Sequence, residues 1–290
     1  MKYYTIIIYL SYNIMPEGPE VRTIADWLNS QVLNKEITSL KYNSTSRYYK
    51  TGIVDHDKLN ALLPMKITEI EAKGKKIFFG LENNEGDFVF LVSSLMMEGK
   101  WTWEKTKHSD LWFETKDKKL YFNDTRHFGT LEIFLSEEEL KNRISDLGPD
   151  LLNDNVSVDV WKKKISEVAN GRSKKLQKIG LFLMEQKYFC GIGNYLRAEI
   201  LYAAKISPHR LLCEISNDES EQLFKCCREI IASSYNSQGA TLATYRNPHG
   251  GKGSFEVVVY NKSHDPNGNE VIGEDIGDKR TTHWVPKVQK

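Results

Sequence analysis

Residues 15–20 read MPEGPE and combine an uncommon nucleophile with carboxylic acids. A proline at the amino terminus of a chain carries a secondary amine, which can condense with a sugar aldehyde carbon to give an iminium. Covalent catalysis of this kind divides one difficult displacement into easier steps. Glu17 is a carboxyl group next to Pro16 and can move the proton that the reaction requires. Inside a longer chain the same nitrogen is an inert amide, so this chemistry requires Pro16 to be the first residue.

Residues 1–14 therefore decide whether the proline nitrogen is free. The apolar run at residues 3–10 is too short to span a bilayer. No small-residue cleavage site follows it, which disfavours a signal peptide. We expect residues 1–14 to be upstream sequence absent from the active protein, with translation starting at Met15 and that methionine removed. If Met1 is the start, processing before Pro16 is required instead.

Composition indicates an intracellular protein with packed cores. The 290 residues are 40% hydrophobic, enough for one large or two to three modest domains, and no stretch predicts a membrane span. The four cysteines have no metal-ligand spacing, and an even number is weak evidence for disulfides without an export signal. We therefore expect reduced thiols, no metal and no cofactor.

The charge is unevenly distributed although the formal net charge is only +1. Residues 161–210 hold eleven lysines and arginines, Lys174 among them, against three glutamates. Concentrated positive charge is typical of a site for a polyanion. Solvated helix faces are the simpler explanation of the charge by itself.

Hydrophobic spacing predicts a β domain, then a helical domain, then a small β appendage. Apolar residues recur at helical spacing over residues 19–32, with Pro19 in the first turn. Residues 147–150 (LGPD) mark a linker. Many short strands at even spacing favour a sandwich or barrel. The predicted strands are residues 37–42, 66–72, 75–81, 88–93, 111–115, 120–123 and 130–134, and a terminal hairpin joins 255–260 to 281–285. The predicted helices are residues 158–169, 175–185, 194–204 and 218–234.

Three further motifs carry chemistry. Residues 74–76 (GKK) place Lys75 at a turn between two strands, and residues 191–194 (GIGN) lie between two predicted helices. Glycines allow backbone N–H groups to approach a phosphate, and a helix amino terminus adds donors and a favourable dipole. Asn194 can cap that helix or bind the phosphate itself. The last motif is RTTHWVPKVQ at residues 280–289.

In this order and spacing, the four motifs resemble those of the formamidopyrimidine-DNA glycosylase and endonuclease VIII family of base-excision repair enzymes. The resemblance covers nearly everything from Met15 to Lys290, and residues 16–20 are closer to the endonuclease VIII wording. It implies that Pro16 attacks the sugar carbon bearing the damaged base, that Glu17 protonates the opening deoxyribose, and that Glu20 is a supporting acid. It also implies that Lys75 lies near the reacting sugar and its phosphate.

The resemblance also implies a set of DNA contacts. Gly191, Gly193 and Asn194 correspond to the family's helix-two-turn-helix, in which the asparagine holds DNA backbone, and Arg280 corresponds to the arginine that holds the phosphates flanking the lesion. Two loops at residues 95–99 and 124–129 resemble the family's intercalation loops. There the side chains that would fill the space left by the everted nucleotide are those of Met97, Arg126 and Phe128. Apolar and planar groups recover part of the stacking lost on flipping, although Met97 and Phe128 also suit an ordinary core.

The carboxyl-terminal motif departs from the zinc-finger members of the family. Val285 and Val288 stand at two cysteine positions, and Asn267 and Glu270 stand where the first cysteine pair would fall. No thiolate ligand remains, which excludes the zinc site and indicates a zincless finger.

These observations predict an α+β enzyme. Its parts are a β-sandwich catalytic domain with a leading helix at 15–135, a linker at 136–152, a helix-two-turn-helix domain at 153–245, and a lesion loop with a zincless β-hairpin finger at 246–290. The implied activity is a bifunctional DNA glycosylase and abasic-site lyase that removes oxidised pyrimidines and formamidopyrimidines through a Schiff base on Pro16, followed by β,δ-elimination. Its expected partner is double-stranded DNA with oxidised bases or abasic sites, with single-stranded DNA left open, and the protein is expected to be an intracellular monomer with access to DNA.

Two other classes of function stay open. A non-catalytic helix-two-turn-helix nucleic-acid-binding protein is favoured if residues 1–14 are retained. An RNA- or ribosome-associated protein is the second, because similar helix-two-turn-helix elements occur in such proteins. A secreted or membrane-anchored protein rests only on the apolar run at residues 3–10.

Overall fold

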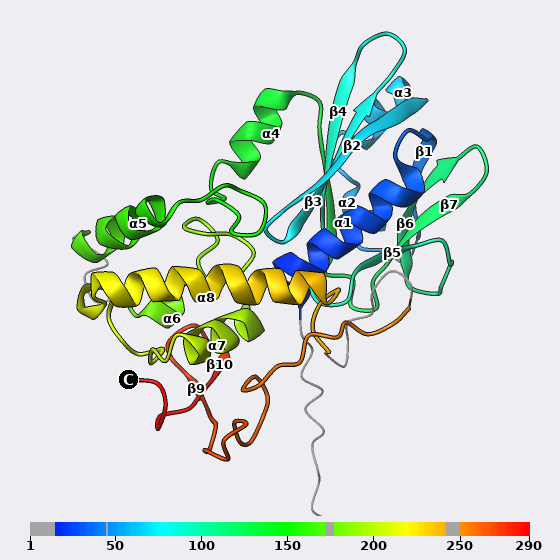
Figure 1. Cartoon of the computed structure of the whole chain (residues 1–290). Helices are drawn as coiled ribbons and strands as arrows, with labels where there is room; N and C mark the ends of the chain where they lie inside the picture. The colour runs from blue at the N-terminus through cyan, green and yellow to red at the C-terminus, as the bar shows by residue number, and fades with distance from the viewer. Residues whose placement is uncertain (1–14, 45, 172–176, 242–249) are drawn as a thin grey trace, which may run out of the picture.

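The structure, a computed structural model, describes residues 15–290 except residues 45, 172–176 and 242–249. A β domain with a leading helix precedes a helical part and a short carboxyl-terminal hairpin, so the predicted α+β class is confirmed (Figure 1). The leading helix α1 (Gly18–Val32) begins one residue before the predicted range and buries Val21, Ile24 and Leu28 on one face. That face packs against strand β2 (Met65–Lys73).

The β domain is an antiparallel sheet of eight strands that folds over on itself. Its order is β5-β7-β6-β1-β2-β3-β4-β8. The two halves join where β1 pairs with β2 through only Glu36–Lys66 and Ile37–Met65. Phe79 of β3 contacts the rings of Trp101 in β5 and Phe113 in β6, at 5.7 and 5.8 Å between centroids, although β3 pairs with neither strand. Side chains from the two halves thus meet in one core, which is the packing of a β-sandwich. The remaining strands are β1 Glu36–Tyr42, β3 Lys76–Glu82, β4 Phe88–Ser94, β5 Lys100–Thr102, β6 Ser109–Thr115, β7 Lys119–Asn123 and β8 Thr130–Phe134.

Four elements of this half and its linker are absent from the sequence prediction. They are the strand β5 and the helices α2 (Tyr48–Thr51), α3 (His56–Leu62) and α4 (Glu137–Ile144). Each is eight residues or shorter, and α4 buries no residue. Elements this short have too few turns for a hydrophobic period to stand out. The segment predicted as a linker therefore contains a helix, which Ser136 caps by accepting a bond from the Glu139 N–H.

The helical part is built around α7 (Asn194–Ala203) and the long α8 (Asn217–Asn236), with α5 (Val158–Asn170) beside α8. Figure 1 shows α8 crossing the molecule, and it contacts α1, α5 and α7. Ser216 and Glu219 form a capping box at the start of α8. The fully buried Trp161 of α5 donates its indole N–H to the Ser220 carbonyl, which fixes α5 against α8. A 3₁₀ turn, η1 (Leu212–Glu214), precedes α8.

The predicted helix at residues 175–185 is wrong in its extent. Only α6 (Ile179–Phe182) is an α-helix, and residues 175 and 176 lie outside the described residues. Lys178 is extended (φ −71°, ψ 143°), and the Ile179 N–H donates to the Arg210 carbonyl instead of within a longer helix. Gly180 allows residues 179–180 to pair closely with residues 208–210, because a Cβ on Gly180 would lie 3.0 Å from the Pro208 carbonyl oxygen. A tertiary contact thus replaces the helical bonds that the periodicity predicts.

The terminal hairpin exists, but its predicted first strand is wrong. β10 (Thr281–Trp284) pairs with β9 (Ile272–Asp275), not with residues 255–260. The N–H groups of Val258, Val259 and Tyr260 all donate to the buried carboxylate of Glu199, at 2.8 to 3.0 Å. Burial raises the pKa of Glu199, and these donors oppose that rise. Since a buried carboxylate requires donors, this segment wraps around it and cannot form a ladder.

Side-chain hydrogen bonds organise the turns of the finger. Asp265 accepts four bonds, from the backbone N–H groups of Asn267 and Asn269, the Asn269 side chain and the Tyr202 hydroxyl. Gln289 accepts from the Val285 N–H and donates to the Ile206 carbonyl, while Val285 is fully buried. Among the described residues no group of His, Cys, Asp or Glu is arranged to hold a metal ion. An aspartate and a glutamine therefore hold the two turns of this finger.

Metal chelation is expected to leave the finger intact, because protein hydrogen bonds hold its turns. Asp265→Ala removes four accepted bonds and should speed amide hydrogen exchange over residues 265–269 without unfolding the β-sandwich. Exchange mass spectrometry with and without chelator checks both outcomes, and Glu270→Ala, which removes an exposed finger carboxylate, is the control. Faster exchange on adding the chelator alone would contradict this account.

Candidate active site

One cavity of about 370 Å³ brings together predicted site residues that are far apart in the sequence. Glu17, Lys75, Met97, Asn194 and Arg280 all line it. They come from the start of α1, the β2–β3 turn, the loop after β4, the first residue of α7 and the residue before β10. Six further residues line the cavity that were not predicted to belong to the site. They are Met15, Met184, Tyr260, Asn261, Thr281 and His283.

Pro16 is buried at the start of α1, next to this cavity. Met15 precedes it in the full chain, so its nitrogen is an amide there. The N–H of Glu17 donates to Glu20 at 3.0 Å, which fixes the peptide that joins Pro16 to Glu17. Pro16 therefore lies between two residues that line the cavity, Met15 and Glu17.

The side-chain carboxylate of Glu17, the residue before α1, binds at the amino terminus of α7. Its carboxylate oxygens accept from the backbone N–H groups of Gly193 at 2.7 Å, Tyr195 at 3.0 Å and Leu196 at 3.2 Å. The open donors and the positive end of the helix dipole both favour an anion in this place. Gly193 is required here, since a Cβ would lie 2.2 Å from the Glu17 carboxyl carbon.

This arrangement corrects the phosphate role predicted for the two glycines. The Gly193 N–H donates to Glu17, and the Gly191 N–H donates to the Gln186 side chain at 3.0 Å. The anion at the start of α7 is thus a protein carboxylate. Both glycine N–H groups donate to protein side chains, so neither is free to bind a phosphate. Gly191 instead lets its backbone approach that of Gly18 closely. The Gly18 N–H donates to the Gly191 carbonyl at 2.9 Å, and a Cβ on Gly18 would lie 3.2 Å from the Gly191 Cα. The cap of α7 is Gly193, not Asn194.

Burial controls the protonation of the site. It raises the pKa of Glu17 to about 7, while Lys75 and the backbone donors act in the opposite direction. Burial also lowers the pKa of Lys75, which Glu17 opposes and Arg280 reinforces. The two groups therefore approach each other in proton affinity, a condition that suits proton transfer near neutral pH.

Glu20 anchors a second buried network behind the site. Its carboxylate accepts from the Tyr195 hydroxyl and from the Ala240 N–H, both at 2.9 Å, and the same hydroxyl contacts the Ser234 hydroxyl. Burial raises the pKa of Glu20, and these bonds oppose the rise. Glu20 does not line the cavity, so it acts on the site through Glu17.

Lys75 is placed by a turn that only glycine fits. Gly74 has φ +57°, and a Cβ there would lie 2.8 Å from the Cys190 Cβ. Its N–H donates to Asp150 at 2.7 Å. The turn of the sandwich is thereby fastened to the segment that leads into α7, with the half-buried Lys75 directed to the cavity.

Met97, Arg126 and Phe128 lie together, as the resemblance implies. A guanidinium nitrogen of Arg126 is 3.3 Å from the Met97 sulfur, and the Arg126 guanidinium lies over the Phe128 ring at 5.4 Å. Phe128 is 47% exposed, which is unusual for a large apolar side chain and leaves it free to contact another molecule. Between them His127 has φ +57° and contacts the buried Asp110 at 2.6 Å, which holds the loop. Lys174 lies outside the described residues, as does the start of the predicted lesion loop, residues 246–249.

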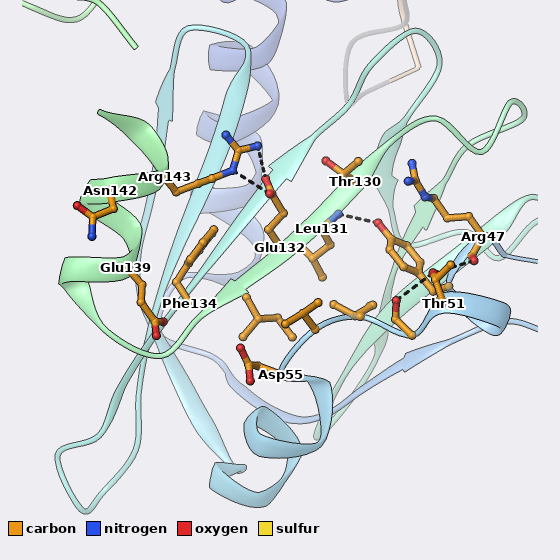
Figure 2. A pocket seen from close by; sticks show the side chains of 15 residues that line it. Arg47, Thr51, Asp55, Thr130, Leu131, Glu132, Phe134, Glu139, Asn142 and Arg143 are labelled. Carbon is orange, nitrogen blue, oxygen red and sulfur yellow. Dashed lines mark hydrogen bonds and ion pairs between the residues drawn. The ribbon is translucent and has the colours of Figure 1, made fainter. Parts of the chain in front are cut away.

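A larger cavity lies elsewhere. It measures about 870 Å³ between α2, β8 and α4, and no residue predicted for the site lines it. Figure 2 shows Arg143 in its lining forming two bonds to Glu132. The Tyr48 hydroxyl accepts the N–H of Leu131 on the free side of β8. The described lining of this 870 Å³ cavity contains no acid–base pair like Glu17 and Lys75 in the smaller cavity.

Comparisons with known proteins agree with this geometry. Models of the formamidopyrimidine-DNA glycosylase N-terminal domain, H2TH domain and C-terminal domain match residues 15–131, 147–246 and 250–290. The chain belongs to the formamidopyrimidine-DNA glycosylase family. It is a DNA glycosylase of the formamidopyrimidine type, an enzyme of DNA repair.

Individual relatives match over their whole length. The formamidopyrimidine-DNA glycosylase of Ureaplasma parvum is 30% identical, over 95% of this chain and 100% of its own. The crystal structure of MutM (Fpg) from Thermus thermophilus superimposes with a TM-score of 0.80 at 27% identity, covering 94% of this chain and 98% of the other. A complex of Lactococcus lactis Fpg with DNA containing an abasic site gives 0.80 at 26%, covering 94% and 99%. In the part of the glycosylase that the structure describes, no helix is long and apolar enough to cross a membrane.

The site residues that the sequence analysis missed differ in how visible they are. His283 and Thr281 lie within the motif at residues 280–289, and the alternation of β10 places both on the same face, at the cavity that Arg280 also lines. Tyr260 ends the segment that wraps around Glu199 and Asn261 follows it, so no periodicity places these two residues at the site. Arg197, one of the basic residues counted above, is fully buried and is not part of an exposed basic surface.

Gly193→Ala tests the seating of Glu17. The added methyl group must displace the carboxyl, and a displacement near 1 Å at a reacting centre costs roughly 10²-fold in rate. We expect single-turnover base release to fall by about that factor. The control is Gly171→Ala, where φ is −66° and the nearest atom to a Cβ is 3.3 Å away. Equal rates for both variants would contradict the required close approach.

Proposed function

We propose that this glycosylase removes oxidised pyrimidines and formamidopyrimidines from DNA and then cleaves the abasic site, using Pro16 as a covalent nucleophile. The observation that carries the proposal is the cavity in which Glu17, Lys75 and Arg280 meet beside the buried Pro16. An acid with a pKa near 7, a lysine of lowered pKa and an arginine suit a reaction that moves protons beside a phosphate.

The chemistry begins when Pro16 is the first residue. Its secondary amine attacks the sugar carbon C1′, the damaged base departs with the electron pair of its bond to C1′, and the base takes up the proton that the amine loses. Glu17 donates a proton to the ring oxygen as the deoxyribose opens, leaving an iminium between Pro16 and C1′. Loss of a C2′ proton then expels the 3′ phosphate, a second elimination expels the 5′ phosphate, and water releases the sugar fragment from Pro16. Glu20 supports this sequence by holding the N–H of Glu17.

Double-stranded DNA containing a damaged base or an abasic site is the proposed partner. The Lactococcus lactis relative, a similar structure, forms a complex with DNA containing an abasic site. Lys75, Asn194 and Arg280 are the proposed phosphate ligands, because donors that line a cavity next to the nucleophile can hold the backbone beside the reacting sugar. Met97, Arg126 and Phe128 are proposed to fill the space of the everted nucleotide. Assignment to the endonuclease VIII branch and action as a monomer stay predictions.

A protein that begins at Pro16 should form a covalent adduct with DNA that borohydride traps, since reduction converts the iminium to a stable amine. We expect adduct on duplexes that carry an abasic site or an oxidised pyrimidine, measured by denaturing electrophoresis, and none after acetylation of the Pro16 nitrogen, which converts the amine to an amide. The full chain of 290 residues is the matched control, because its proline nitrogen is an amide. Binding of lesion DNA without any adduct from the Pro16 form would instead support a non-catalytic DNA-binding protein.

Ring opening to the iminium, measured as single-turnover strand cleavage, should slow as pH rises through about 7. Glu17 donates a proton, its pKa is raised to about 7, and its protonated form is therefore lost above that value. Glu17→Gln keeps the shape but has no proton to donate at neutral pH, so it should lower the rate by roughly 10²–10⁴-fold and abolish this alkaline limb. Single-turnover rates from pH 5 to 9 check the profile. An alkaline limb that persists in Glu17→Gln would assign the titration to another group.

A further inference from the structure

A buried guanidinium lies behind the cavity wall. Arg197 of α7 has no exposed side-chain surface and is among the largest fully buried side chains of the described chain. A buried charge is strongly unfavourable unless it is paired and hydrogen-bonded, so its partners show what it holds in place.

Two partners of Arg197 belong to different parts of the fold. One nitrogen forms an ion pair with Asp278 at 2.8 Å, in the turn between β9 and β10. The other donates to the side-chain oxygen of Asn194, the first residue of α7. The Nε atom has no hydrogen-bond partner among the described residues. The planar fork of the guanidinium thus joins α7 to the finger.

The contact with Asn194 determines which end of its amide faces the cavity. A guanidinium only donates, so the atom of Asn194 beside it must be the oxygen. The amide nitrogen donates to the Thr281 carbonyl at 3.0 Å, and the amide also hydrogen-bonds to the Tyr260 side chain. Because Asn194 and Tyr260 both line the cavity, the donor end of the amide faces the space where an anion would bind.

The contact with Asp278 fixes the finger arginine. Asp278 accepts from the Arg280 N–H at 3.2 Å and lies 3.6 Å from its guanidinium. The Arg280 side chain is still 52% exposed and lines the same cavity. Arg197 therefore holds Asn194 directly and holds Arg280 through Asp278.

We propose that Arg197 is a positioning residue that aligns Asn194 and Arg280 as one unit for the phosphodiester segment around the reacting nucleotide. This inference rests on the proposed function, because it assigns both side chains to DNA phosphates. Through Asp278 and Asn194, the unit ties the finger to α7 in the geometry that binds DNA. Arg197 itself touches no phosphate.

Asp278→Asn distinguishes positioning from simple electrostatics by the sign of its effect. Removing a negative charge beside a polyanion site should tighten binding if only net charge matters. The positioning role predicts the reverse, a weakening of about ten- to a hundredfold, because an NH2 donor replaces one of the two oxygens through which residue 278 joins Arg197 to Arg280. The assay is the affinity of the protein for a duplex carrying tetrahydrofuran in place of an abasic nucleotide, with an undamaged duplex for comparison. Glu270→Gln, the same change of charge at an exposed finger residue, should bind as tightly as the parent or more tightly.

A double-mutant cycle tests the unit itself. In the Asp278→Asn background, Arg280→Ala should cost much less affinity than it costs in the parent, since groups that act together are not additive. If Asp278→Asn does not fold by its thermal midpoint, the neutral pair Arg197→Met with Asp278→Asn removes both charges and replaces it in the cycle. Additive losses, or undiminished affinity in a folded variant, would overturn the positioning role. Lack of preference for the tetrahydrofuran duplex by the parent protein would overturn the proposed function as well.

Discussion

The carboxylate of Glu17 at the amino terminus of α7 is the interaction on which the rest of the site depends. It brings a residue of the β-sandwich domain to three backbone donors of the helical part, so both halves contribute to one group. The close approach requires glycine at 193, and the neighbouring contact between Gly18 and Gly191 requires small residues on both sides. The same burial that seats Glu17 raises its pKa to about 7, which couples the packing of two domains to the acid–base chemistry.

A second set of polar contacts ties the finger to this centre. Arg197 bonds to Asn194 and Asp278, and Asn194 bonds to the Thr281 carbonyl at the start of β10. The turns of the finger are held by Asp265 and Gln289, where related zinc-finger proteins have metal ligands according to the resemblance of the motif. Side-chain hydrogen bonds thus hold the backbone turns of the finger, and the buried ion pair between Arg197 and Asp278 docks the finger on α7.

Sequence reasoning succeeded where a period or a motif was long enough. The leading helix, seven of the eight sandwich strands and the helices α5, α7 and α8 follow from apolar spacing over many residues. It failed where a tertiary bond competed with a local pattern. Residues 255–260 are rich in valine and aromatic residues, as strands are, but residues 258–260 give their N–H groups to Glu199. Residues 175–185 have a helical pattern, although the Ile179 N–H pairs with the Arg210 carbonyl.

The amino-acid sequence by itself determined the family, the order of the domains and the candidates Glu17, Lys75, Asn194 and Arg280, because residue types at fixed spacing carry that information. Only the tertiary structure decided that Gly193 serves a carboxylate instead of a phosphate, and that Arg197 is buried between Asn194 and Asp278. The bond between Glu17 and Leu196 joins residues 179 positions apart. Such partners are chosen by burial, which leaves each polar group only the donors and acceptors that the fold brings within reach.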